Sequence, residues 1–142
     1  NRSEVFETGD IVIFDPSCSA LGKRPKLNFD FGYKQIQQSA GYQMELAAYA
    51  VEYLKPGGIF MYNTCTLAID ENEMICKELI ENYSLTPLFV EIPDYFSQKY
   101  KVGRGIPIEG LEDHCKNFVR FYVGKELGES YFIAILKKEP NN

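Results

Sequence analysis

Residues Ile11–Ser19 read IVIFDPSCS, an apolar run followed by an acid, a proline and a cysteine between two serines. Residues Ile59–Thr66 read IFMYNTCT and again place a cysteine just past an apolar run. Short apolar runs bounded by turn residues predict buried strands. In open α/β sheets, ligands bind at the C-terminal ends of the strands. Cys18 and Cys65 are therefore expected at one sheet edge, where a thiolate nucleophile would have a helper and the acid Asp15 beside it.

The composition limits the classes of protein that fit. With 142 residues, 45% hydrophobic and 25% charged, the chain is one domain at most and long enough to bury a core. It has no apolar run long enough for a transmembrane span and no visible signal peptide. Its four cysteines form no CxxC pair, which disfavours a structural zinc site and a secreted disulfide scaffold. A disulfide between Cys18 and Cys65 is disfavoured because the chain looks intracellular. The formal net charge of −5 disfavours nucleic-acid binding by bulk electrostatics, so such binding needs a local patch or a further part of the protein.

The pattern along the chain predicts alternating strands and helices that end in a hairpin. Strands are expected at Asp10–Phe14, Ile59–Tyr62 and Leu85–Ile92, helices at Tyr33–Leu54 and after a cap at Asp70, and a closing antiparallel pair at Phe118–Val123 and Tyr131–Lys137. The run Lys55–Gly58, KPGG, should end the first helix, and Glu71 and Glu73 should favour the dipole of the second. Pro87 should confine its strand to an edge. Residues 93 to about 117 are expected to form an irregular loop.

The two cysteine motifs carry a resemblance to a known family. Asp15–Ser19 is similar to the Asp-x-Pro-Cys-Ser motif of the Sun/Fmu/Nop family of RNA (cytosine-5) methyltransferases, and Tyr62–Thr66 followed by Glu71–Glu73 resembles its Tyr-Ser-Thr-Cys-Ser and Glu-Asn-Glu motif. The KPGG run fits the family, as does Arg120 followed by Tyr131–Ala134. These markers stand in the right order over nearly the whole chain.

The chain also departs from the family pattern. Proline and serine are exchanged in the first motif, a variant that, like the stretch Gly110–Cys115, resembles the branch acting on large-subunit ribosomal RNA. Ala20 and Ser130 stand where glycine is common. No glycine-rich cofactor loop precedes the first strand. The expectation is therefore an α/β fold, the C-terminal half of a Rossmann-like S-adenosylmethionine-dependent methyltransferase, with a mostly parallel sheet ending in an antiparallel hairpin and residues 1–142 as a partial catalytic domain.

The resemblance implies a role for each residue of the two motifs. Cys65 would attack a cytosine of RNA, and Cys18 would assist release of the methylated product. The branch that the first motif resembles implies that this RNA is ribosomal. Asp15 would contact the cofactor S-adenosylmethionine and hydrogen-bond the cytosine. The resemblance also implies two partners, the RNA and the N-terminal half of the domain. Without the leading strands the sheet edge at Ile11–Phe14 would be bare, so self-association of the fragment is expected. The resemblance implies an intracellular location, nuclear or nucleolar in a eukaryote and cytoplasmic otherwise.

Several residues are open to a structural interpretation as well as a functional one. Asp15, Pro16, Lys23, Arg24 and Lys26 are candidates for contact with the RNA, although a short basic run is usually a solvated face. A weaker second basic patch holds Lys99, Lys101 and Arg104. Cys76 should belong to the core, and no metal is expected, because the pair His114–Cys115 lacks further ligands. The alternative function is a noncatalytic RNA-binding or scaffolding module of the same fold, inert without an upstream half.

Overall fold

The computed structural model describes residues 6–24, 32–124 and 128–140. The strands are β1 (Gly9–Phe14), β2 (Leu54–Thr64), β3 (Leu85–Leu88), β4 (Lys101–Arg104), β5 (Val119–Tyr122) and β6 (Tyr131–Lys138). The helices are α1 (Tyr33–Glu52), α2 (Glu73–Tyr83), α3 (Asp94–Lys99) and α4 (Glu112–Cys115). The expected order of strands and helices is confirmed up to β3, as is the closing antiparallel pair β5–β6. No helix among these described residues is long and apolar enough to cross a membrane.

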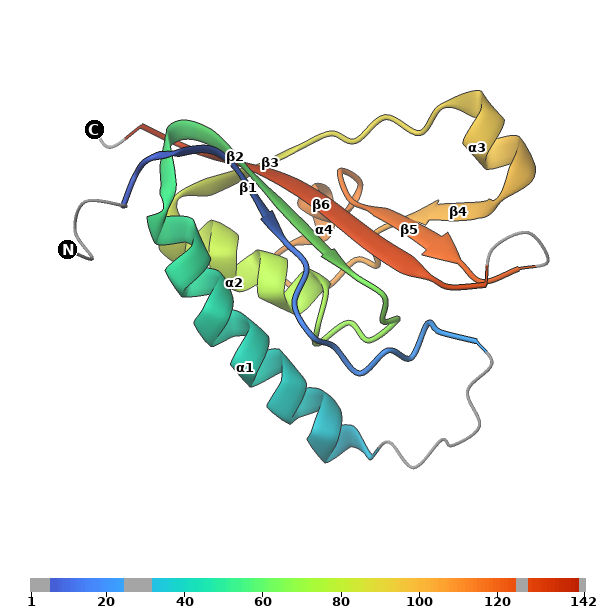
Figure 1. Cartoon of the computed structure of the whole chain (residues 1–142). Helices are drawn as coiled ribbons and strands as arrows, with labels where there is room; N and C mark the ends of the chain where they lie inside the picture. The colour runs from blue at the N-terminus through green and yellow to red at the C-terminus, as the bar shows by residue number, and fades with distance from the viewer. Residues whose placement is uncertain (1–5, 25–31, 125–127, 141–142) are drawn as a thin grey trace.

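The strands form one sheet in the order β1-β2-β6-β5-β4, with β3 pairing the other end of β6 (Figure 1). The expectation of a mostly parallel sheet is wrong for these described strands, because only β1 and β2 pair in parallel. Because α1 connects β1 to β2 and α2 connects β2 to β3, these three strands run in the same direction. However, β6 runs back between β2 and β3, so its pairings with both are antiparallel. As Pro87 predicted, β3 is an edge strand that pairs β6 alone among the described strands.

The connection between α1 and β2 differs from the expected turn. Helix α1 ends at Glu52, and the KPGG run Lys55–Gly58 lies inside β2 instead of before it. The register of β1 on β2 shifts there, since Gly9 pairs Leu54 but Ile11 already pairs Ile59. The irregularity uses a positive φ of 81° at Gly57, a conformation that glycine adopts without steric cost.

Two further segments differ from the expectation. Helix α2 begins at Glu73 with Asn72 as its N-cap, so Asp70 and Glu71 precede it instead of capping it. Residues 93–117 are not wholly irregular, because they contain α3, β4 and α4. Hydrophobic periodicity could not predict these elements, because a segment of four to six residues is too short for its pattern to differ from that of a loop.

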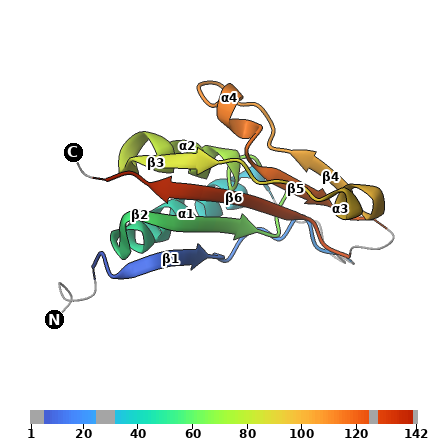
Figure 2. The ribbon, with the colours of Figure 1, turned by 90° about the horizontal axis from the view of Figure 1, so that it is seen from above.

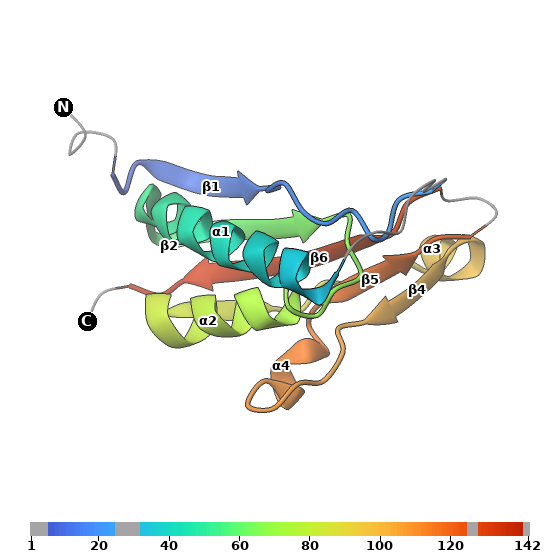
Figure 3. The same ribbon diagram turned by 90° about the horizontal axis from the view of Figure 1, so that it is seen from below.

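Helices α1 and α2 cover one face of the sheet, while α3 lies on the opposite side, beside β5 and β6 (Figure 2, Figure 3). The core lies under α1 and α2, where buried side chains alternate along the strands, as in Phe60 and Tyr62 of β2 or Phe132 and Ala134 of β6. On the opposite face of β1, Ile11 and Ile13 are 65% and 69% exposed. The fold thus places the ends of β1 and β2 side by side and leaves the outer face of β1 open.

Candidate active site

The two cysteines expected at one sheet edge do meet there. Phe14 pairs with Tyr62 at the parallel ends of β1 and β2, so the loops that follow leave the sheet together. The Sγ atoms of Cys18 and Cys65 lie 3.3 Å apart, within hydrogen-bond distance for sulfur. Both are free thiols and both are half-buried. The sequence therefore predicted this pairing correctly, and the two thiols can act on one substrate.

A hollow of about 340 Å³ opens beside the thiols. It is lined by Asp15, Pro16, Ser17, Cys18, Ala20, Lys23 and Cys65. Most of the residues assigned to catalysis, cofactor and RNA thus come together, with Asp15 and Lys23 exposed at the hollow. Lys23 pairs loosely with Glu129, with 4.0 Å between Nζ and Oε1. Arg24 is exposed next to Lys23 but does not line the hollow, and Lys26 lies outside the described residues.

Glu71 ties the two cysteine loops together. This fully buried carboxylate accepts hydrogen bonds from the backbone N–H of Ser19 at 2.9 Å and from the Ser19 hydroxyl. It also accepts from the hydroxyl of Thr66 at 3.1 Å and from the side-chain amide of Gln43 at 2.9 Å. Ser19 follows Cys18 and Thr66 follows Cys65, so one carboxylate sets the spacing of both thiols. Hydrogen bonds to a charged acceptor are the stronger kind, which suits this role.

Further contacts hold the first cysteine loop in place. The Gln43 side chain of α1 also donates to the carbonyl of Ser17 at 2.8 Å. The N–H of Gly22 donates to the carbonyl of Cys65 at 3.0 Å, and a Cβ at Gly22 would lie only 2.6 Å from that oxygen. Ala20 has a positive φ of 53°, the region that favours glycine, which gives a physical reason for the glycine common there in the family.

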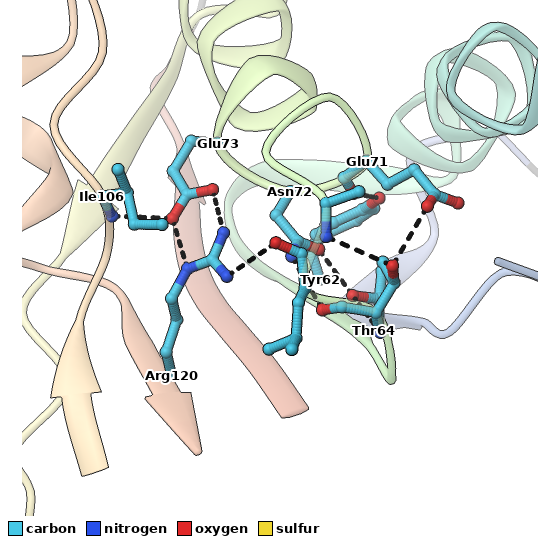
Figure 4. Close-up of polar contacts among 10 residues, drawn as sticks. Tyr62, Thr64, Glu71, Asn72, Glu73, Ile106 and Arg120 are labelled. Atoms are coloured by element: carbon cyan, nitrogen blue, oxygen red, sulfur yellow. Dashed lines mark hydrogen bonds and ion pairs between the residues drawn. The ribbon is translucent and has the colours of Figure 1, made fainter. Parts of the chain in front are cut away.

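The residues after Glu71 anchor the second cysteine loop. Asn72 accepts from the hydroxyl of Thr64 at 2.5 Å and donates to the carbonyl of Thr66 at 3.0 Å. Glu73 forms a buried ion pair with Arg120, in which Arg120 Nε lies 2.7 Å from Glu73 Oε1. Arg120 also donates a hydrogen bond to the carbonyl of Leu67 (Figure 4). The loop between β2 and α2 is therefore fixed at both ends by buried polar contacts.

Electrostatics favour the protonated form of the second thiol. Burial raises the pKa of Cys65 to about 12, with further contributions from the hydrogen bond and the charge of Cys18. Lys23 acts in the opposite direction and lowers the pKa of Cys65. Cys65 is thus a thiol at neutral pH in this arrangement. Forming its thiolate requires either a change around Cys18 or more positive charge near the hollow.

The remaining cysteines do not join the site. Cys76 is fully buried in the core, as expected, and burial raises the pKa of its thiol well above the usual value. Cys115 is also buried, whereas its neighbour His114 is exposed. No group of three or more potential metal ligands occurs in the part of the chain that the structure describes.

Sequence reasoning missed the positioning residues of the site. Glu71 and Glu73 were expected to serve the dipole of α2, but Glu71 binds the cysteine loops and Glu73 binds Arg120. Gln43 was not singled out, because a single polar residue on a helix gives no sign of what it faces. The available signal was the Glu-Asn-Glu run itself, which is unusually polar for a segment between a buried strand and an amphipathic helix.

Comparison with known proteins agrees with this geometry. The family described as 16S rRNA methyltransferase RsmB/F matches residues 2–137. A tRNA (cytosine(72)-C(5))-methyltransferase from Pyrococcus horikoshii is 33% identical over 91% of this chain and 29% of its own length. The ribosomal RNA small subunit methyltransferase F of Aeromonas hydrophila is 32% identical over 93% of this chain and 26% of its own length.

A solved structure is similar as well. The crystal structure of NSun6 from Pyrococcus horikoshii with SFG, an S-adenosylmethionine analogue, has a TM-score of 0.71 and 32% identity over 91% of this chain and 30% of that one. The chain thus spans less than a third of the length of these relatives. The large-subunit branch stays a prediction. Because the family match extends over almost every described element, including both cysteine loops and their positioning residues, the chain belongs to the RsmB/F family of S-adenosylmethionine-dependent methyltransferases.

Proposed function

We propose that the protein carrying this chain transfers a methyl group from S-adenosylmethionine to carbon 5 of a cytosine in RNA, by way of a covalent adduct between Cys65 and the base. The observation that carries the proposal is the 3.3 Å approach of the Cys18 and Cys65 thiols at the floor of an open hollow. Its relatives support the same reaction class, because their names describe cytosine-C5 methylation of tRNA and methylation of ribosomal RNA.

The chemistry gives a reason for two thiols. Carbon 5 of cytosine is a poor nucleophile until a thiolate adds to carbon 6 and makes the ring enamine-like. After methylation, a base removes the proton on carbon 5 and the bond between sulfur and carbon 6 breaks, which returns the thiolate of Cys65. Sulfur suits both steps, because it is strongly nucleophilic and also leaves readily. Cys18, in contact with Cys65, is placed to assist the release.

The hollow fits the reacting parts of both substrates. S-adenosylmethionine supplies an electrophilic methyl group when bound. A volume of about 340 Å³ admits a cytosine ring that has left its stack, as base-modifying enzymes require. Asp15 presents a carboxylate at the hollow for the cytosine edge or the cofactor, and Lys23 presents a cation for phosphate. We propose that the rest of the cofactor is held by elements that pair with the outer edge of β1.

Trapping with 5-fluorocytosine tests the covalent step. Fluorine at carbon 5 blocks removal of the carbon 5 substituent, so the full-length protein should form a denaturation-resistant complex with RNA that contains this base. Cys65→Ala should form none. Cys76→Ala is the matched control, because it removes a thiol of the same chain that does not line the hollow.

Two outcomes would contradict the proposal. Trapping that persists in Cys65→Ala would remove Cys65 as the nucleophile. RNA binding with neither trapping nor methyl transfer in the unaltered full-length protein would instead favour the alternative, a noncatalytic RNA-binding module of the same fold.

A further inference from the structure

A second hollow, distinct from the thiol site, lies between α3 and the outer face of β5 and β6. It measures about 230 Å³ and is lined by Phe96, Tyr100, Phe121, Tyr131 and Ile133. Phe121 and Tyr131 are direct cross-strand neighbours. The next pair along, Arg120 and Phe132, is buried under the helices, so alternation turns Phe121 and Tyr131 to the side on which α3 lies (Figure 2).

The rings form a wall with a definite geometry. The Phe96 ring centroid lies 5.8 Å from that of Tyr100 and 6.0 Å from that of Phe121, and Phe96 is 39% exposed. The hollow is smaller than the roughly 300–1,000 Å³ of sites that enclose drug-sized ligands. Its size and its aromatic wall therefore suit one planar ring system, not a whole cofactor.

Positive charge stands at the rim of this aromatic surface. Lys99 Nζ lies 5.5 Å from the ring centroid of Tyr95 and 5.4 Å from that of Tyr100, and it donates to the Tyr95 hydroxyl at 3.1 Å. Lys101 does not add to this charge, because it pairs with Tyr122 and so faces the other side of the sheet from Phe121. The acid of α3, Asp94, is at the opposite end of that helix from Lys99. In a chain with a formal net charge of −5, aromatic rings paired with the Lys99 cation favour a ligand that combines a flat ring with negative charge.

A chain of polar contacts links the second hollow to the thiol site. The Tyr131 hydroxyl donates to Glu129 Oε2 at 2.8 Å, and Glu129 in turn lies 4.0 Å from Lys23, which lines the thiol site. Hydrogen bonding to Glu129 raises the pKa of Tyr131, and the charges of Cys65 and Asp15 contribute to the same shift. Tyr131, which lines the second hollow, is therefore joined through Glu129 to Lys23, which lines the first.

We propose that the second hollow binds the unstacked base of a nucleotide near the target cytosine in single-stranded RNA, with Lys99 contacting an adjoining phosphate. The inference rests on the proposed function, because it gives the same RNA a second point of attachment. Aromatic side chains stack on any base, so this subsite positions the strand without reading its sequence.

A tryptophan reporter tests the stacking directly, because the chain contains no tryptophan. Phe96→Trp places an indole in the wall of the hollow, and its emission should be quenched when a single-stranded oligoribonucleotide containing cytosine binds. Tyr49→Trp is the matched control, since Tyr49 is a 56% exposed aromatic residue on α1, which covers the opposite face. The titrations are carried out in the full-length protein with Cys65→Ala, so that no covalent adduct contributes.

Affinity measurements complete the test. We expect Phe96→Leu to weaken binding about 5- to 150-fold, the range for losing one stacked base, while Phe96→Tyr keeps the ring and the affinity. Lys99→Gln should reduce the slope of log Kd against log salt by about 0.7, as for one phosphate contact to a single strand.

Each outcome separates this inference from the proposed function. Quenching of the Phe96→Trp indole, with the Tyr49→Trp indole unaffected, supports the inference whether or not the protein transfers methyl groups. RNA that binds without any quenching, while the full-length protein with Cys65 intact methylates it, overturns the inference and leaves the proposed function standing. A Phe96→Trp emission already shifted to the blue and insensitive to RNA also overturns it, because a protein segment would then fill the hollow.

Discussion

Replacing Glu71 by glutamine should separate the two cysteine loops while changing almost nothing in side-chain size. The buried carboxylate accepts hydrogen bonds from Ser19, Thr66 and Gln43, and through Ser19 and Thr66 it joins the loops that carry Cys18 and Cys65. A neutral amide keeps the shape of the carboxylate but removes the charge that strengthens each bond.

The magnitude follows from the number of donors. A hydrogen bond to a charged group contributes about 1.5–3 kcal/mol and a neutral one about 0.5–1.5 kcal/mol, so each of the Glu71 bonds loses about 1 kcal/mol. The glutamine variant also avoids the free-energy cost of burying a charged side chain, which offsets part of this loss. We therefore expect the free energy of unfolding to fall by about 2–4 kcal/mol for Glu71→Gln. That is a large share of the total of about 5–15 kcal/mol for a typical domain.

Urea unfolding measures the change, and Glu78→Gln is the matched control. Glu78 lies on the exposed side of the same region, in α2, where it accepts one hydrogen bond from Asn82 at 2.9 Å. With an m-value of about 2 kcal/mol/M, the midpoint for Glu71→Gln should drop by about 1–2 M, while that for Glu78→Gln should hardly move. Trapping by 5-fluorocytosine RNA should also slow in Glu71→Gln. Equal midpoints for the two variants, with unchanged trapping, would show that Glu71 does not position the loops.

Four other predictions concern the thiols, the loop backbone and the open edge of the sheet. Because its pKa is raised to about 12, the Cys65 thiol should react slowly with iodoacetamide at neutral pH and faster as pH rises, as mass spectrometry of the alkylated peptide would show. Cys18→Ala removes a hydrogen bond and a charge that raise the pKa of Cys65, so it should accelerate that alkylation. If Cys18 assists release, the same variant should accumulate adduct with normal RNA, and ordinary turnover without adduct would limit Cys18 to lining the hollow. Ala20→Gly should raise the free energy of unfolding by about 1 kcal/mol in urea, because removing the steric strain of alanine at its positive φ outweighs the larger entropy that glycine gives the unfolded chain. A clear loss of stability would contradict this. The 142-residue chain should self-associate in light scattering through the β1 edge at Ile11–Phe14, and a monomer over a wide concentration range would count against an open edge there.

The sequence by itself determined the elements whose physical signal is local. The apolar run Ile11–Phe14 and the run at Ile59 predicted β1 and β2, because short apolar runs bounded by turn residues are typical of strands. The expectation that β1 is a buried strand is wrong for the described chain, since Ile11 and Ile13 on its outer face are exposed. Two cysteines placed just past those runs had to meet once the strands paired in parallel, so the thiol pair was predictable. The motifs also indicated the family correctly.

Only the tertiary structure decided which distant groups share a buried site. Glu71, Gln43 and Ser19 come from three segments, and a polar residue in isolation gives no sign of the partner that will satisfy it when buried. The same holds for the pairing of Glu73 with Arg120 and for the insertion of β6 between β2 and β3, which made the sheet mixed instead of mostly parallel. The aromatic hollow under α3 is of this kind too, because Phe96 and Phe121 belong to elements too short to show a period and become neighbours only through the antiparallel folding of β4 on β5 and β5 on β6. Periodicity reports which side of an element is buried, whereas specificity among buried polar and aromatic groups arises from the packing of whole elements against one another.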